Sequence, residues 1–339
     1  MSIYNKNLNT GTNEKKSKIY DCFMFFNELE ILNLRFEYLS PYVDFFVLVE
    51  SRKTTQGNPK PLFYDKNKLK FKKYAHKIKH LIIDDFPKSI DSWSRETLQR
   101  NYAISALSKC DDSDLILVSD VDEIPNLSKI PKKLNDGVVY HFLQDHFRYY
   151  ANTYKENHII WEGGTKIVTF KTIRDNLIDE AFVKYGETFK DEFNLGASLS
   201  KIRLYRKTYL IYNGGFHFSY FGGISRILKK LESFPHEELI KSGKYTEEFI
   251  SDQLSKGIDI INSDHKIYRL PNKEILEISR KLLPEFFFNV NCRVQNKFIY
   301  KLNRYIEIIK IFFRSLLRIA FLTFLRFIYK VLKKSLKKT

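Results

Sequence analysis

The chain has 339 residues, 43% of them hydrophobic, which is enough for one large catalytic domain with a sizeable core and an appendage. Its formal net charge of +17 would suit a nucleic-acid partner, but residues 297–339 hold 12 Lys or Arg and a single acid, and so carry 11 of those charges. The rest of the chain has an ordinary charge balance, so no nucleic-acid partner is expected. The three cysteines, Cys22, Cys110 and Cys292, show no metal-binding spacing and indicate a reducing compartment.

The first third of the chain alternates apolar runs with helical patterns. This alternation predicts βαβ units around a mostly parallel sheet, and therefore an α/β fold. The expected strands are residues 19–26, 43–49, 81–83 and 115–119, and the expected helices are residues 28–39, 66–79 and 93–109, the first capped by Asn27 and the last opened by Ser92.

Beyond Pro131 the pattern changes, and the expected elements become shorter. Residues 144–161 are rich in aromatic side chains and are expected to form a wall or a loop. The other expected elements are strands over residues 138–142 and 166–171, a hairpin of residues 202–204 with 209–212, and helices over residues 224–232 and 247–256.

Four parts are expected along the chain. Residues 1–17 are polar, lack the apolar core of a secretory signal, and are expected to be a disordered leader. Residues 18–270 are expected to form the catalytic domain, residues 271–297 a connecting helical segment, and residues 298–339 a basic, apolar helix.

Cations punctuate the apolar C-terminal part, mostly at spacings of four residues. The longest uncharged run between them, residues 319–325, is too short to cross a bilayer. An interfacial helix with Lys and Arg reaching the headgroups fits this pattern best, and its basic end would meet anionic lipid. We therefore expect a peripheral protein on the cytoplasmic face of a membrane. The alternative is a helix docked on the protein itself or on a second subunit.

The acidic sequence from Asp120 to Pro125 follows the apolar run 115–118. Side chains alternate along a strand, so Asp120 and Asp122 are expected on the same side, just past the carboxyl end of a buried strand. Ligands bind at that edge of open α/β sheets, and paired carboxylates suit a hard divalent cation. Short motifs also occur by chance, and Glu123 is open to two interpretations: an acid supporting the site, or a brace for the turn.

Three further polar residues are candidates for the same edge. Glu50 ends the second expected strand and could accept hydrogen bonds from a base or ribose, or could be a solvated loop acid. Arg95 and Arg100 are candidates for diphosphate contacts, because a guanidinium fork matches phosphate oxygens. They are five residues apart and do not share one helical face, so at least one is expected to be structural, paired with Glu96 or an acid at the sheet edge.

Short blocks in a fixed order extend from about residue 19 to residue 265. They are residues 25–29 with Leu32 and Arg35, residues 43–51 followed by Thr54, Gly57, Lys60 and Pro61, residues 93–96 with 99–101, the acidic sequence, Trp161, residues 164–165, residues 214–219, and residues 233–234 with His236 and Glu238. The ordered set resembles glycosyltransferase family 17, whose known eukaryotic members are β-1,4-N-acetylglucosaminyltransferases that add bisecting GlcNAc to N-glycans.

The resemblance implies a GT-A-like αβα sandwich that uses Mn²⁺ or Mg²⁺. Asp120 and Asp122 would hold the ion, with His217 as a third metal ligand or a phosphate contact; the alternative for His217 is a buried core residue. Trp161 and the pair Tyr149–Tyr150 would stack on sugar faces or belong to the core. The implied reaction moves N-acetylglucosamine from UDP-GlcNAc to a glycan acceptor with inversion, giving a β linkage.

Inversion requires one general base for the acceptor hydroxyl, and the sequence offers Glu238, Asp145 and Glu162 as candidates. Each of these is individually more typical of a surface acid. Two other interpretations of the chain stay open: the same fold with another donor such as UDP-galactose or UDP-glucose, and a non-catalytic protein that binds membranes or nucleic acid through its tail.

Overall fold

The computed structural model describes residues 16–175, 199–205, 208–233, 235, 241–270, 283 and 297–335. Several expectations therefore lie outside the described residues: almost all of the leader 1–17, nearly all of the connecting segment 271–297, the candidate base Glu238, and Cys292.

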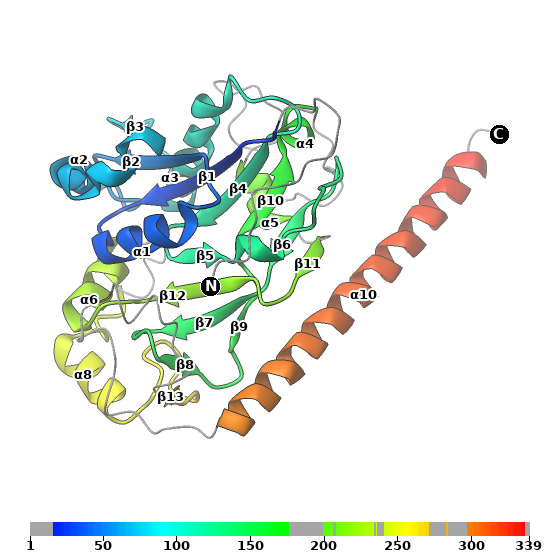
Figure 1. Cartoon of the computed structure of the whole chain (residues 1–339). Helices are drawn as coiled ribbons and strands as arrows, with labels where there is room; N and C mark the ends of the chain where they lie inside the picture. The colour runs from blue at the N-terminus through cyan, green and yellow to red at the C-terminus, as the bar shows by residue number, and fades with distance from the viewer. Residues whose placement is uncertain are drawn as a thin grey trace.

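The fold is mixed α/β, with a central seven-stranded sheet in the order β11-β6-β10-β4-β1-β2-β3 (Figure 1). Strands β1 to β4 run parallel to one another, as predicted, whereas β10 is antiparallel to both β4 and β6. The strands are β1 (Ile19–Phe25), β2 (Phe45–Ser51), β3 (Ile78–Ile83), β4 (Leu115–Asp120), β6 (Tyr140–Phe142), β10 (Lys166–Thr169) and β11 (Tyr209–Ile211).

Both faces of the central sheet are buried at its inner strands, because alternate residues of β1, β2, β4 and β10 enter different clusters. Phe23 and Phe25 of β1 pack with α1 (Leu29–Leu39), whereas Tyr20 and Cys22 pack on the opposite face. That opposite face is covered by α3 (Ser92–Tyr102), the 3₁₀ helix η2 (Ala103–Leu107) and α5 (Leu199–Leu204). Burial on both sides explains why these strands appear in the sequence as continuous apolar runs.

A second, four-stranded sheet lies beside the first, in the order β5-β12-β7-β9 (Figure 1). Part of the aromatic segment 144–161, expected to be a wall or loop, supplies three strands instead. The strands of this sheet are β5 (Glu123–Pro125), β12 (Gly215–Ser219), β7 (Gln144–Arg148) and β9 (Ile160–Trp161), and β8 (Thr153–Lys155) pairs separately with β13 (Ile267–Arg269).

Two expected helix starts are wrong by one residue. Glu28 is the N-cap residue of α1, and the N–H of Asn27 donates to the Glu28 carboxylate instead of Asn27 capping the helix. The carboxylate of Asp91 accepts from the Ser94 N–H at 2.6 Å and caps α3, so Ser92 is already inside the helix.

Two expected elements take a different form. The predicted helix 66–79 is α2 (Phe63–Asn67) followed by the 3₁₀ helix η1 (Lys68–Lys77), whose buried residues Phe71 and Tyr74 are three apart, as suits three residues per turn. The predicted hairpin strand 202–204 is the end of α5, because Leu199 and Ile202 are both buried at helical spacing.

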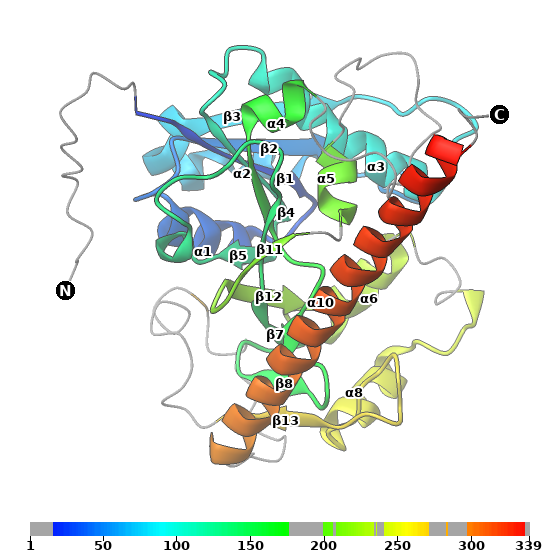
Figure 2. The same ribbon diagram turned by 90° about the vertical axis from the view of Figure 1, so that its right-hand side faces the viewer.

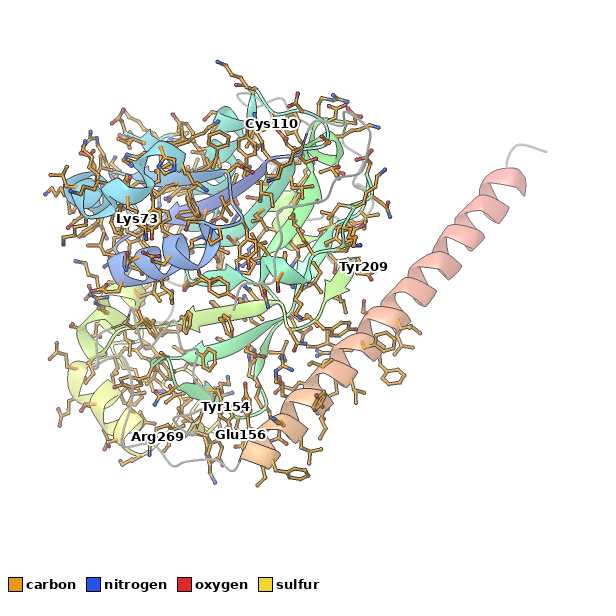
Figure 3. All side chains as sticks on the ribbon, viewed as in Figure 1. Lys73, Cys110, Tyr154, Glu156, Tyr209 and Arg269 are labelled. Carbon is orange, nitrogen blue, oxygen red and sulfur yellow. The ribbon has the colours of Figure 1, made fainter. Side chains whose placement is uncertain are left out.

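The remaining helices are short, with one exception. They are η3 (Leu127–Lys129), α4 (Phe170–Arg174), α6 (Ile224–Ser233), α8 (Glu247–Ser255) and the long α10 (Lys297–Ser335). The first part of α10 lies against the body (Figure 2 and Figure 3). There the Glu307 carboxylate accepts from the N–H groups of Ile159 and Ile160 at 2.8–3.0 Å, and Arg304 pairs with Asp145. Among the described residues, no helix is both long and apolar enough to cross a bilayer.

A buried arginine connects α1, β1 and the turn after β4. Arg35 is fully buried, and its guanidinium bonds to both carboxylate oxygens of Asp21. The same guanidinium donates to the carbonyl oxygens of Asp120, Val121 and Glu123, at 2.7–3.2 Å. One side chain therefore fixes the backbone of the acidic sequence against the sheet.

We expect Arg35→Met to lower the free energy of unfolding by about 3–5 kcal/mol, because it leaves the Asp21 carboxylate buried without its cation. The matched control is Arg52→Met: Arg52 pairs with Asp84 at the surface, where a pair contributes about 0–1 kcal/mol. Urea unfolding of the two variants checks this, and equal losses would contradict the central role of Arg35.

Candidate functional site

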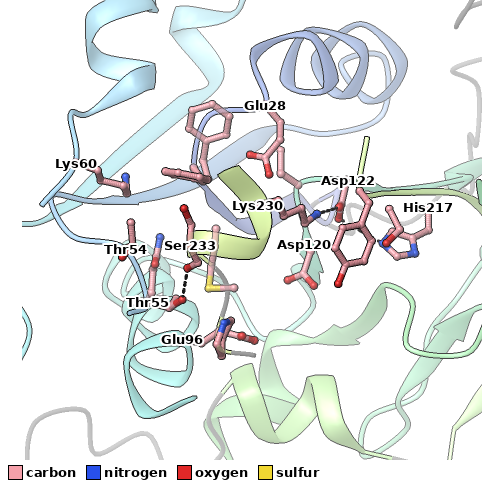
Figure 4. A pocket seen from close by; sticks show the side chains of 18 of the residues that line it. Glu28, Thr54, Thr55, Lys60, Glu96, Asp120, Asp122, His217, Lys230 and Ser233 are labelled. Carbon is pink, nitrogen blue, oxygen red and sulfur yellow. Dashed lines mark hydrogen bonds and ion pairs between the residues drawn. The ribbon is translucent and has the colours of Figure 1, made fainter. Parts of the chain in front are cut away.

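A cavity of about 330 Å³ lies where the carboxyl ends of the parallel strands meet the second sheet (Figure 4). Its walls come from the ends of β1 and β4, the loop after β2, helices α3 and α6, and strand β12. This is the edge at which open α/β sheets bind ligands. Asp120, Asp122, His217 and Trp161, all singled out from the sequence, line this cavity.

Asp120 is the last residue of β4 and is held between two guanidinium groups. Arg100 Nη1 lies 2.7 Å from Asp120 Oδ1, and Arg203 Nη2 lies 3.2 Å from Oδ2. Burial opposes the carboxylate charge, but Arg100 and Arg203 outweigh it and hold the pKa of Asp120 below its ordinary range. Both oxygens of Asp120 are therefore engaged by cations.

Asp122 lies in the turn between β4 and β5 and meets a different set of partners. Lys230 Nζ on α6 is 2.8 Å from Asp122 Oδ2, and His217 Nε2 is 3.6 Å from Oδ1. Burial, reinforced by Lys230, lowers the pKa of His217 well below its ordinary value, so the imidazole is neutral. The carboxylate and the neutral imidazole together form a pair of groups that can ligate a cation.

Gly215 allows β12 to bring His217 to this position. Its φ is +112°, and a Cβ there would lie 2.1 Å from the carbonyl oxygen of Ile124. Without a side chain, β12 can pair closely with β5, in a register that places His217 opposite Glu123. A Cβ at Gly214 would lie 2.8 Å from the backbone of Leu143, so both glycines of the sequence block have a direct structural reason.

His217 lies in a cluster of aromatic rings at the cavity wall. Its ring is 4.8 Å from that of His146 with an interplanar angle of 14°, and 4.5 Å from that of Trp161. The Trp161 Nε1–H donates to Glu123 Oε1 at 2.6 Å. Of the predicted stacking pair, Tyr149 is buried and donates its hydroxyl to Asp259, and Tyr150 packs against the same apolar cluster, so both belong to the core.

Glu123 belongs to the charge network beneath the cavity. It is fully buried and shares Arg203 with Asp120. Burial raises the pKa of Glu123 to about 7, with Asp120 and Asp122 adding to the rise and Arg203 opposing it. Its Oε2 also accepts from the Asp120 N–H at 3.2 Å, so Glu123 both braces the turn after β4 and belongs to the charge network of the cavity.

Two residues predicted to contact the nucleotide have other partners. The buried Glu50 carboxylate accepts from the backbone N–H groups of Tyr64 and Asp65, and so holds the start of α2. Arg95 donates to the Thr55 carbonyl at 2.9 Å and positions the loop after β2. Arg95 thus acts on the cavity wall through the loop that it supports, whereas the helix held by Glu50 contributes no lining residue.

Arg100 matches the expectation that one of the two arginines is structural. It pairs with Glu96 of the same helix at 2.8 Å and with Asp120 at the end of β4, and so connects α3 to the edge of the sheet.

Two candidate bases lie away from the cavity: Asp145 pairs with Arg304 and Glu162 with Arg314, both on α10. The third candidate, Glu238, lies outside the described residues.

The sequence did not indicate Arg203 and Lys230, although both bond directly to the predicted acids. Each is one of several basic residues on a helix, and its acid lies 80 or more residues away in the chain. No local pattern marks such a cation.

Within the part of the chain that the structure describes, no three His, Cys, Asp or Glu side chains are grouped to hold a metal, so the predicted trio of Asp120, Asp122 and His217 reduces to the pair Asp122 and His217.

Comparisons with known proteins identify a family and named relatives. The model of glycosyltransferase family 17 matches residues 6–173, about half of the chain. The β-1,4-mannosyl-glycoprotein 4-β-N-acetylglucosaminyltransferase of Homo sapiens is 30% identical over 127 residues, 35% of this chain and 22% of that protein. Its counterpart from Rattus norvegicus is 28% identical over 140 residues, 39% of this chain and 24% of that protein. The matches thus span about a quarter of the length of these curated relatives.

Among solved structures, the crystal structure of GalNAc-T7 with UDP, GalNAc and Mn²⁺ aligns with a TM-score of 0.37 and 10% identity, over 65% of this chain and 48% of that one. The family match and the two named relatives agree with the ordered blocks seen in the sequence. Through residues 6–173, this chain belongs to glycosyltransferase family 17.

Proposed function

We propose that the protein is a metal-dependent, inverting glycosyltransferase of GT-A-like αβα architecture, which transfers N-acetylglucosamine from UDP-GlcNAc to a glycan acceptor in β linkage. Membership of family 17 and the names of the relatives support sugar transfer. The observation that carries the proposal is the cavity at the strand ends, where Asp122 and His217 meet. UDP-galactose and UDP-glucose are the alternative donors, because donor choice depends on a few pocket contacts.

The residues around Asp122 fit a divalent ion. Its Oδ1 and His217 Nε2 are 3.6 Å apart, which lies between the ~3.0 Å of neighbouring ligands and the ~4.2 Å of opposite ligands on an ion with bonds of about 2.1 Å. Asp120 fits less well, because Arg100 and Arg203 engage both of its oxygens. We therefore assign Asp122 and His217 as protein ligands of Mn²⁺ or Mg²⁺. When bound, the ion would supply positive charge for a diphosphate leaving group.

The chain's own groups have defined tasks in this scheme. Lys230 holds Asp122 Oδ2 and, with three N–H donors, can also bond to a phosphate oxygen. The Glu96 Oε2 atom is buried in the cavity wall without a hydrogen-bond partner among the described residues, and can accept from a ribose hydroxyl. Trp161 presents an aromatic surface beside His217 that suits the apolar face of a sugar.

The general base must lie beside the acceptor. Asp145 and Glu162 are poor candidates, since each is paired with an arginine of α10 outside the cavity. Glu238 follows three residues after Pro235, which lines the cavity, and it stays the proposed base on the strength of that nearness in sequence.

We further propose that α10 lies on an anionic membrane surface at the cytoplasmic side. Tyr300, Arg304, Glu307 and Ile311 face the body, and the outward side of the helix carries exposed apolar residues. By helical register, the exposed Lys301 and Lys310 border that outward side. An apolar face bordered by cations is typical of an interfacial helix. The exposed apolar residues are Phe298, Ile299, Leu302, Tyr305, Ile306, Ile309, Phe312, Phe313, Leu316 and Leu317.

We expect release of UDP from UDP-GlcNAc to require Mn²⁺ or Mg²⁺ and to stop in EDTA. Asp122→Asn should lower the rate roughly a hundred- to thousandfold, because one group that fixes charge at the leaving group is lost. Thermal shift with Mn²⁺ alone provides a second readout, since the variant should lose the metal-induced rise in Tm. Asp84→Asn, at an exposed aspartate outside the cavity, is the control.

Two results would contradict this scheme. Full UDP release in EDTA would remove the metal from the mechanism. Faster turnover of UDP-galactose or UDP-glucose than of UDP-GlcNAc would replace the donor while retaining the reaction class.

We expect the full chain to sediment with vesicles of phosphatidylcholine and phosphatidylglycerol, but not with phosphatidylcholine alone. The double variant Ile309→Asp with Phe313→Asp should weaken this binding at least about tenfold, because two apolar side chains no longer enter the lipid. Leu69→Asp is the control, since Leu69 is equally apolar and 82% exposed on η1. A dimer in solution that is lost with the double variant would show that the face binds a second copy instead.

A further inference from the structure

One end of the cavity contains a cation that the proposed reaction does not use. Lys60, in the loop after β2, lines the cavity, and its Nζ is buried with no hydrogen-bond partner among the described residues. That Nζ lies 5.4 Å from the ring centroid of Phe26 and 6.0 Å from that of Phe63. In Figure 4, Lys60 extends into the cavity from the end opposite His217.

The surroundings of Lys60 are held in place. The backbone N–H of Lys60 donates to the Arg52 carbonyl at 2.8 Å, and Thr55 Oγ1 donates to the Ser233 carbonyl at 2.6 Å. Burial lowers the pKa of Lys60 to about 8, with the carboxylates of Glu50 and Glu28 opposing the change. A desolvated N–H donor without an acceptor is costly, so a ligand that supplies an acceptor here gains affinity.

The topology shows which part of a nucleotide sugar would reach Lys60. In the central sheet, β1 lies between β4 and β2. The carboxyl end of β4 leads to Asp122, and the carboxyl end of β2 leads to the loop that contains Lys60. Neighbouring strands are about 4.8 Å apart, so these ends are ~10 Å apart. That separation is comparable to the reach of an extended nucleoside diphosphate from its phosphates to its base. A diphosphate beside Asp122 therefore brings the base to the Lys60 end.

We propose that Lys60 donates a hydrogen bond to the O4 carbonyl of the donor's uracil and thereby selects uridine over cytidine nucleotides. This inference rests on the proposed function, because it takes the diphosphate to lie beside Asp122. Uracil presents a carbonyl acceptor at position 4, whereas cytosine presents an amino donor there. An ammonium facing that amino group would leave both donors unpaired. The ring of Phe26 lines the same end and offers the base an apolar contact.

The test compares the affinities of the full-length protein for UDP and CDP, measured calorimetrically with Mn²⁺ present. Wild type is expected to prefer UDP. Lys60→Met should weaken UDP binding about ten- to hundredfold while CDP binding changes little, so that the ratio of affinities approaches one. Lys60→Gln should also bring the ratio close to one while binding both nucleotides, because its amide can donate to a carbonyl and accept from an amino group.

Lys53→Met is the matched control. Lys53 lies in the same loop and lines the same cavity, but its ammonium pairs with Asp85 at 2.6 Å, so the ratio should stay as in wild type. A wild-type ratio retained by both Lys60 variants would overturn the assignment of Lys60 and leave the proposed transferase intact. Failure of the wild-type protein to bind either nucleotide would instead overturn the proposed donor class, and the inference with it.

Discussion

The hydrogen bonds of one buried guanidinium hold together the part of this protein on which the cavity depends. Arg35 neutralises Asp21 in the middle of β1 and, in the same plane of donors, fixes three carbonyl groups of the turn after β4. A planar group with five fixed donors can meet a carboxylate and a turn at once, which an ammonium cannot do. The orientation of the Asp120–Glu123 backbone is thus determined by helix α1, about ninety residues earlier in the chain.

Charge compensation dominates the cavity itself. The acids come from one short stretch, but the cations that balance them come from three separate helices: Arg100 from α3, Arg203 from α5 and Lys230 from α6. Such a site can hold several carboxylates close together before any ligand arrives, because each is paired. It also distinguishes the two aspartates. Asp120 is committed to guanidinium groups, whereas Asp122 keeps one oxygen directed at a neutral imidazole.

The sequence predicts well those features that depend on neighbouring residues. Strands β1, β2 and β4 are visible as apolar runs, and the acids at the end of β4 follow from strand alternation and sheet-edge chemistry. Glu50 shows the limit of this reasoning. Its place at a strand end is correct, but its carboxylate turns to the N–H groups of a helix whose start the sequence did not indicate. The pairing of Lys230 with Asp122 cannot be predicted from a local pattern, because the two residues are far apart in the chain.

The docked helix α10 covers one edge of the second sheet, where another chain could otherwise pair. Strand β9 is the outer strand of the second sheet, and the Glu307 carboxylate occupies the N–H groups of Ile159 and Ile160 at that border. An uncovered strand of this kind is a template for pairing with another chain. The helix therefore also protects this edge from aggregation. A shortened chain without α10 would expose the backbone N–H groups that the Glu307 carboxylate covers in the native protein.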